Sequence, residues 1–429
     1  MMRREVVVTG MGLVTALGGT VEENWAGVEA LRTGIAHFPK DGLPPFFQYC
    51  GKVARCEVPE HISPKLQGEM RFLNRGAHLG LVSACQAVWQ SGAKLPDTAP
   101  GRRALYIASG DFTKVGYEFM HPATREASDA RWEAVDCRRL NDAALHRVNP
   151  FFLLESISNN LFSFLSALLE FRGPSTSLAS LSPYGAQALE LACRSIEGGR
   201  ADMALAVGYG NWITEIPVYE LEGLGLLSKC ASGPGSFRPF DRFRDGFIPG
   251  EGGAALFLEA AEPAARRGAM VLARIRGSAN CIEPSPGHGI SVPLRVNRRS
   301  MRMALEDAGM GLGDMGFISA HGSATPKGDR SELRSILDVA QAHGADVPVC
   351  GMKPYTGHMG AASDLAEIIL GICALQQGVL PATLHFRQAE REFAGVNISS
   401  HHRRCEKRAF LSLSYGMGGQ SSSIVVTTS

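Results

Sequence analysis

The chain has 429 residues, of which 45% are hydrophobic and 20% are charged, so it can bury a core larger than that of one ordinary domain. Its formal net charge of +1 lacks the basic excess expected for a nucleic-acid partner. The ten cysteines form no CxxC pair and no Cys/His cluster with zinc spacing. We therefore expect a cytoplasmic protein with reduced thiols, no metal site and, since no apolar run reaches membrane length, no membrane span.

Short β-rich runs alternate with helical patterns along the chain. The run EVVVTG at 5–10 predicts a buried first strand rather than a signal peptide, because glycines interrupt the apolar stretch that follows it. Helical patterns occupy 77–92, 160–171 and 331–344. This alternation is typical of layered α/β architecture. The comparable element content on either side of residue 260 indicates an internal duplication.

The segment 177–196, SLASLSPYGAQALELACRSI, predicts a strand, a tight turn and an amphipathic helix. Pro183 stands at the expected first helical position and Ser182 at the expected N-cap. A helix N-terminus stabilises negative charge, so Ser182 could be a nucleophile, a cap or the relic of a lost active site. The G-x-S-x-G pattern of hydrolases does not fit, because Ser180 stands where the first glycine would be.

Two histidines in the second half each follow a predicted strand next to glycine. His321 begins HGSATPKGD, which ends at Asp329, and Lys353 precedes His358 by five residues in KPYTGH. A pair of neutral imidazoles can donate hydrogen bonds to a thioester carbonyl and stabilise the charge that develops there. The alternative is that both histidines fill polar turns as structural residues.

Two glycine-rich stretches differ in what they indicate. TGMGLVTALGG at 9–19 lacks the G-x-G-x-x-G spacing of a dinucleotide site. The loop at 411–423, LSLSYGMGGQSSS, contains Gly416, Gly418 and Gly419, which allow backbone amides to point at a substrate oxygen. A simple turn between two terminal strands is the alternative.

Taken in order, these segments resemble the β-ketoacyl-acyl carrier protein synthases of the thiolase superfamily, the condensing enzymes of fatty acid and type II polyketide synthesis. The resemblance runs nearly end to end, through residues 4–35, 149–152, 238–259, 321–329, 353–358 and 415–419. It implies an α/β, thiolase-like fold in which two pseudo-symmetric halves, 1–258 and 259–429, form a five-layered αβαβα protomer that dimerises.

The resemblance also implies roles for individual residues. It places Ser182 in the position of the nucleophilic cysteine, so the thiol itself is missing. The other matches are His321 and His358 as the histidine pair, Lys353 as the lysine, Asp329 and Glu367 as supporting acids, and Met417, between Gly416 and Gly418, as the amide that completes the oxyanion hole with that of Ser182. We expect Ser182 and both histidines to converge in one buried pocket. Two local features depart from the family: GHMGAAS shifts its Gly-Ala-Ala by one position, and Tyr415 and Met417 replace the usual phenylalanines.

The serine changes the expected chemistry. A helix N-terminus lowers the pKa of a thiol but cannot make an alkoxide near neutral pH, so a serine needs an adjacent base, for which His358 is the candidate. The missing thiol favours a chain-length-factor-like subunit that forms a heterodimer with an active ketosynthase. The retained histidines and Lys353 favour the alternative, a homodimeric synthase or acyltransferase that uses Ser182. A third hypothesis is a non-catalytic module that binds acyl chains or carrier protein. In each case acyl carrier protein is the expected partner, its phosphopantetheine carries the substrate, and no cofactor is expected.

Overall fold

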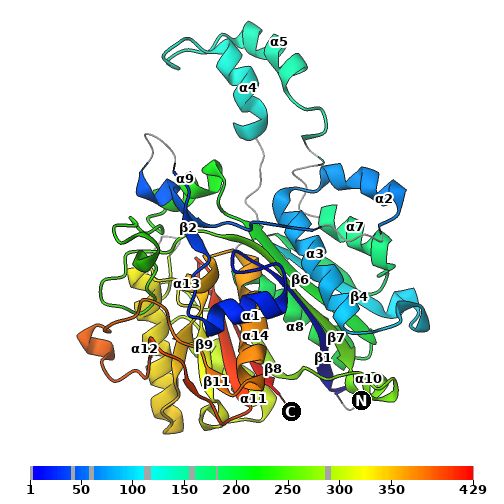
Figure 1. Ribbon diagram of the computed structural model, residues 1–429, viewed down its shortest axis with the longest axis vertical. Helices are drawn as coiled ribbons and strands as arrows, with labels where there is room; N and C mark the ends of the chain where they lie inside the picture. Colours follow the sequence, from blue (N-terminus) through cyan, green and yellow to red (C-terminus); the bar gives the residue numbers. More distant parts are fainter. Residues whose placement is uncertain are drawn as a thin grey trace.

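The computed structural model describes residues 3–39, 44–57, 62–110, 117–152, 154, 160–179, 182–285 and 291–428. Ten strands of this described part form one sheet (Figure 1). The first half contributes, in spatial order, β1 (Val6–Val14), β7 (Glu251–Ala260), β6 (Met203–Asn211), β4 (Arg103–Ser109) and β5 (Ser175–Ala179). The second half contributes β8 (Ala273–Ile282), β14 (Gln420–Thr427), β13 (Ala409–Tyr415), β9 (Phe317–Ala320) and β10 (Val349–Gly351).

The two halves repeat the same topology. In each, the first strand pairs antiparallel with the last, the last pairs antiparallel with the strand before it, and two parallel pairings follow. The halves join where β1 and β8 pair antiparallel over a short stretch that runs from Val6↔Ile275 to Val8↔Ala273. The predicted internal duplication is therefore confirmed.

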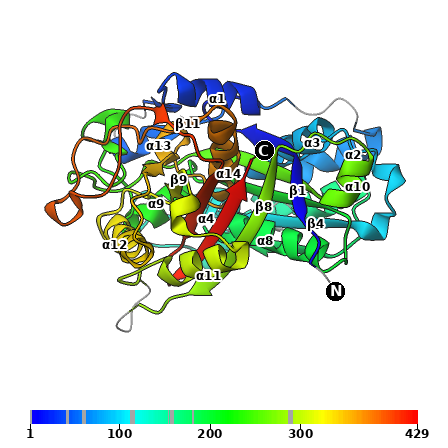
Figure 2. The same ribbon diagram turned by 90° about the horizontal axis from the view of Figure 1, so that it is seen from below.

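The helices complete five αβαβα layers, as predicted. The central layer consists of α8 (Tyr184–Glu197) and α14 (Ala361–Gln376), which pack against each other between the strands of the two halves. The outer face of the first half carries α3 (Arg75–Gln90) and α7 (Asn160–Leu169), and that of the second carries α11 (Arg298–Ala308) and α12 (Pro326–His343). Figure 2 shows α14 near the middle, with α12 on one side and α3 on the other.

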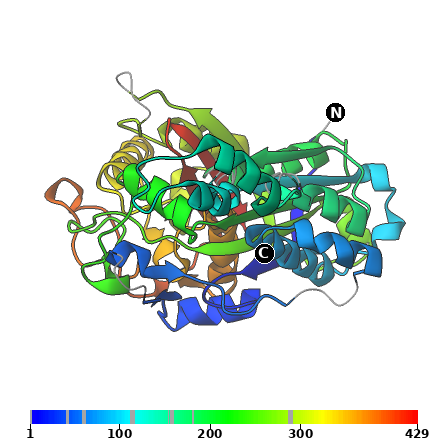
Figure 3. The same cartoon turned by 90° about the horizontal axis from the view of Figure 1, so that it is seen from above.

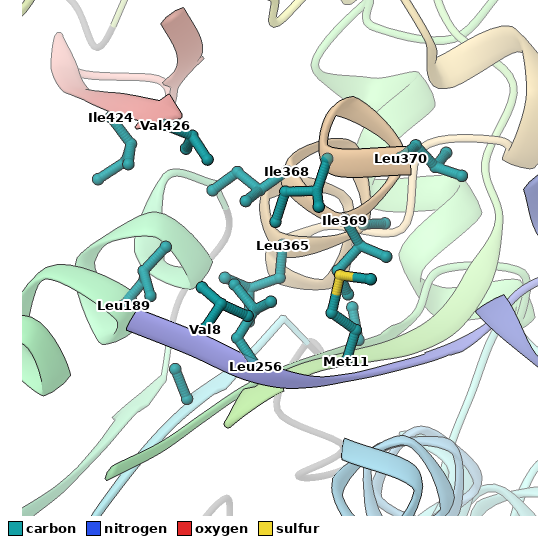
Figure 4. Packing of buried hydrophobic residues seen from close by; sticks show 14 of the residues in the cluster. Val8, Met11, Leu189, Leu256, Leu365, Ile368, Ile369, Leu370, Ile424 and Val426 are labelled. Carbon is teal, nitrogen blue, oxygen red and sulfur yellow. The ribbon is translucent and has the colours of Figure 1, made fainter. Parts of the chain in front are cut away.

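Alternation along the strands separates the layers chemically. In β4, Ala104 and Tyr106 face the central helices, whereas Leu105 and Ile107 face α3 and α7. In the second half, Phe317 packs centrally while its neighbour Ile318 faces α11 and α12. Figure 4 shows the central cluster, in which side chains of β1, β7, α8 and β14 surround α14.

The central helix α14 lies very close to the first half. Every residue from Ala361 to Leu375 is buried. The carbonyl of Ala361 fits against Gly185 of α8 and Gly208 of β6, where an added Cβ would collide with that oxygen. Two glycines of the first half thus make room for the backbone of the second.

The remaining described elements surround this core. The helices are α1 (Val21–Glu29), α2 (Pro64–Glu69), α4 (Tyr117–Ala127), α5 (Cys137–Arg147), α9 (Glu215–Gly223), α10 (Ala261–Arg266) and α13 (Lys353–Thr356). Two small pairs of strands are β2 (Ile35–His37) with β3 (Tyr49–Gly51) and β11 (Val379–Leu380) with β12 (Arg403–Arg404). Helices α4 and α5 pack on each other and project from the body in Figure 1, and from above they lie over its middle (Figure 3).

The predicted first strand is β1, which is buried throughout, and the predicted helices at 77–92, 160–171 and 331–344 correspond to α3, α7 and α12. The proposed division between residues 258 and 259 falls near the end of β7, just before α10. None of the helices in the described part of the chain combines the length and apolar character needed to cross a lipid bilayer.

Candidate active site

Side chains from both halves meet at one small cavity. Ser182, from the start of the α8 segment, lines it together with His321 and His358, as predicted. Tyr415, at the end of β13, and Gly416 and Met417, in the loop that follows, also line it. The remaining lining residues are Trp212, Leu221, Leu226, Phe247, Val292, Ser323 and Thr325. The cavity holds about 60 Å³, which is room for a few water molecules.

Ser182 is not the helix cap that the sequence predicted. The N-cap of α8 is Pro183, which offers no side-chain hydrogen bond. The capping acceptor comes instead from α14, because Asp364 Oδ2 accepts the N–H of Gly185 at 3.0 Å. Ser182 Oγ lies 2.9 Å from Asp364 Oδ1 and 3.2 Å from Gly360 O, so its single proton is shared between two acceptors. Burial raises the pKa of Asp364 to about 6, although Lys353, Ser182 and the α8 amides oppose this rise.

His358 is held as a neutral hydrogen-bond donor. The N–H of Gly360 donates to its Nδ1 at 3.2 Å, which leaves the ring proton on Nε2. Its ring stacks on Trp212 at a centroid distance of 4.7 Å, and burial, followed by the charge of Lys353, lowers its pKa well below the usual range. Among the described residues His358 makes no hydrogen bond with Ser182. The structure therefore does not place His358 as the general base that we expected for the serine.

His321 lies directly after β9 and is fixed through its backbone. Its N–H donates to Glu332 Oε1 at 2.7 Å, and its carbonyl accepts from Lys353 Nζ at 2.6 Å. The His321 and His358 rings meet edge to face at a centroid distance of 5.3 Å. Burial lowers the pKa of His321 as well, so both imidazoles are neutral at physiological pH and suited to hydrogen-bond a developing oxyanion.

Lys353 lies behind the histidines rather than in the cavity wall. Its Nζ donates to both carboxylate oxygens of Glu367, at 2.9 and 3.0 Å, and both side chains are buried. Burial raises the pKa of Glu367 to about 7, and the Lys353 charge counteracts that rise. This ion pair joins α13 to α14 and, through the carbonyl of His321, supports the histidine.

Asp329 also lies outside the cavity wall. Its carboxylate accepts the N–H groups of Phe240, at 2.6 Å, and Ala324, at 2.9 Å, and faces Arg244 Nε at 3.4 Å. Burial raises its pKa to about 6, against the effect of Arg244. Asp329 therefore ties the loop after His321 to the segment around Phe240.

The glycine-rich loop leaves one amide available. The N–H of Gly416 donates to Gln420 O and that of Gly418 to Ser291 O. Within the described part of the chain, the N–H groups of Met417 and Ser182 have no acceptor. Gly416 packs against the carbonyl of Ser182 so closely that a Cβ would overlap it. The loop and the start of α8 are thus adjacent, which agrees with the expected pair of oxyanion donors.

Sequence reasoning missed two buried acids of the site. Glu332 accepts the N–H groups of His321 and Gly322, and burial raises its pKa to about 8. Asp364 is, with Glu367, one of two acids in the largely apolar start of α14, AASDLAEII. A charge within an apolar helical run needs a buried partner, and that signal could have indicated Asp364 although not its partner.

The layered fold and the paired histidines define a thiolase-like condensing-enzyme architecture. Residues 3–264 match the family model "Beta-ketoacyl synthase, N-terminal domain" and residues 272–387 match "Beta-ketoacyl synthase, C-terminal domain". The chain belongs to the β-ketoacyl synthase family.

Individual relatives match this chain over nearly its whole length. The 3-oxoacyl-[acyl-carrier-protein] synthase 2 of Vibrio cholerae is 28% identical to this chain, and the match covers 99% of each protein. A putative polyketide beta-ketoacyl synthase 1 of Streptomyces cyaneus is 29% identical over 99% of this chain and 98% of its own. Two solved structures share the fold over 100% of both chains: a type II polyketide acyl carrier protein in complex with its ketosynthase (TM-score 0.83, 22% identity) and the ishigamide ketosynthase/chain length factor (TM-score 0.82, 24% identity).

Proposed function

We propose that this chain is a non-condensing, chain-length-factor-like subunit of fatty acid or polyketide synthesis, which pairs with an active ketosynthase. The observation that carries the proposal is the environment of the Ser182 hydroxyl, which is held between Gly360 O and the Asp364 carboxylate. A condensing enzyme must form a covalent acyl intermediate before carbon–carbon bond formation. A hydroxyl without an imidazole base is a poor nucleophile for that step.

The size of the cavity supports the same proposal. Its space of about 60 Å³ is room for a few waters, which favours a site that does not itself load an acyl chain. Acyl carrier protein is the proposed source of the acyl chain, with the substrate on its phosphopantetheine and no cofactor bound by the subunit itself. The active partner would supply the cysteine and carry out the condensation.

A second candidate function rests on a specific contact. Asp364 Oδ1 lies at hydrogen-bond distance from Ser182 Oγ, and a carboxylate in that position could act as general base for acyl transfer to the serine. The retained His321 and His358 would then stabilise the oxyanion. This candidate predicts an acyl-enzyme ester on Ser182.

One experiment distinguishes the two. The chain is incubated with acyl carrier protein bearing an acyl group, alone and with a cysteine-containing ketosynthase from the same genome, and the mixture is analysed by native and intact-mass spectrometry. We expect a 1:1 heterodimer in which only the cysteine-containing subunit gains the acyl mass. A stable homodimer that ignores the second protein would contradict the proposal. Stoichiometric acylation of Ser182, lost in D364N, would establish the acyltransferase instead.

A further inference from the structure

We propose that the Asp364 carboxylate occupies the N-terminus of α8 and thereby holds position 182 unreactive, so that replacing the serine by cysteine would not by itself restore a nucleophile. Asp364 thus acts as a positioning residue that suppresses activation at this site. The inference rests on the proposed non-condensing function, but it concerns the ionisation of a group at position 182 and can be tested without any acyl substrate.

The Asp364 carboxylate lies at the N-terminus of α8, where the partial positive charge of the helix would otherwise stabilise a thiolate. The first amides of an α-helix carry partial positive charge and favour an anion near them. In this chain, Asp364 Oδ2 accepts the amide of Gly185 at 3.0 Å, so an anion already fills that position. Its other oxygen, Oδ1, faces Ser182 Oγ at 2.9 Å.

Both neighbours of the hydroxyl are acceptors. A thiolate at position 182 would face the carbonyl oxygen of Gly360 and the carboxylate of Asp364, and neither can donate a hydrogen bond to it at neutral pH. A like charge at this distance disfavours the ionised thiol, and burial acts in the same direction. The carboxylate therefore turns a site that would lower the pKa of a thiol into one that raises it.

The other charged groups near Asp364 do not reverse this effect. Lys353 is the cation whose charge acts on Asp364, but its Nζ is bound to both oxygens of Glu367, on the next turn of α14. His358 is neutral and its Nδ1 accepts the N–H of Gly360. Within the described part of the chain, Asp364 is the acid bonded to position 182.

The test compares S182C with S182C/D364N by the pH dependence of iodoacetamide alkylation at position 182, read by peptide mass spectrometry. The midpoint of the profile reports the thiol pKa and, unlike the rate, does not depend on access to the cavity. We expect S182C to show a midpoint above about 8.5, the value of an unperturbed thiol. In S182C/D364N the amide still accepts from Gly185 but carries no charge, and the midpoint should fall by at least about one unit, since helix N-termini lower thiol pKa values below 8.

A matched control removes a different buried acid, one that belongs to α8 itself. Glu190 lies within α8 and pairs with Arg194, so S182C/E190Q should keep the midpoint of S182C. If D364N does not fold, D364S removes the same charge with a smaller side chain. Equal midpoints in S182C and S182C/D364N, or a low midpoint in S182C alone, would overturn the inference. Acylation of the native serine would refute the proposed function while leaving these midpoints unaffected.

Discussion

At the scale of single residues, the site depends on where one carboxylate lies. The sequence locates Ser182 near the start of a helix, because Pro183 and the amphipathic pattern after it mark that start. It could not identify the cap, because the acceptor of Gly185 N–H lies in another helix, at Asp364. A local rule assigned the cap to the nearest hydroxyl, whereas a long-range packing contact supplies it.

The raised pKa of Asp364 predicts a pH-dependent stability difference between the native protein and D364N. Because the folded-state pKa is about 6 against a usual 3.8, the folded state favours the protonated acid. The stabilisation is complete at low pH and is lost as pH rises through 6. The unfolding free energy of the native protein relative to D364N should therefore fall by about 1 kcal/mol between about pH 5 and about pH 8.

Urea denaturation of both proteins at the two pH values measures this difference. Asp329 and Glu332 also have raised pKa values, but they are present in both proteins and their effects cancel. The charge of Asp364 contributes to the raised pKa of Glu367, so the measured difference includes the change that D364N makes in the titration of Glu367. A difference that stays constant with pH would mean that Asp364 does not titrate in this range.

At the scale of elements, the histidines depend on the junction between α13 and α14. Lys353 and Glu367 form a buried ion pair there, and Lys353 also holds the carbonyl of His321. The strands that precede the histidines are predictable, because short β-rich runs end directly before His321 and before the KPYTGH segment. The four-residue helix α13 and its ion pair with α14 are not predictable, because a buried ion pair leaves no periodic pattern in the sequence.

We expect K353M to destabilise the protein by about 3–5 kcal/mol, because it leaves the Glu367 carboxylate buried without its cation. The double variant K353M/E367Q should recover part of that loss, since no charge remains unpaired. Chemical denaturation at neutral pH measures both.

The exposed pair of Arg266 and Glu262 on α10 provides the matched comparison, and R266M should change stability by less than about 0.5 kcal/mol. If K353M proved as stable as R266M, the Lys353–Glu367 ion pair would not be needed to hold α13 against α14.

At the scale of the whole molecule, two equivalent halves share one central layer. The duplication could be inferred from the sequence because each half has the same alternation of strands and helices. The close contact between the halves could not be inferred from the sequence, because it depends on which glycine lies against which backbone segment. Gly208 of β6 is one such residue, and a Cβ there would lie 2.6 Å from Ala361 O.

We therefore expect G208A to destabilise the protein by about 1–3 kcal/mol through overpacking between the halves. Thermal unfolding, followed by circular dichroism, measures the loss. The control is G223A, at the end of α9, where no atom lies within 4 Å of an added Cβ and stability should be unchanged or slightly higher. Equal melting temperatures for the two variants would show that the contact between the halves can adjust.

The buried position of α14 also has a consequence for the order in which the chain is made. Strands of the first half, including β7 with Leu256 and Leu258, share their core with a helix that ends at Gln376. Translation at roughly 5–20 residues per second leaves an interval on the order of ten seconds between completion of β7 and emergence of α14. During that interval the central face of the first half is covered by α8 alone, and the part that packs against α14 stays uncovered. The nascent chain is therefore open to chaperone binding, proteolysis and aggregation before its second half has been synthesised.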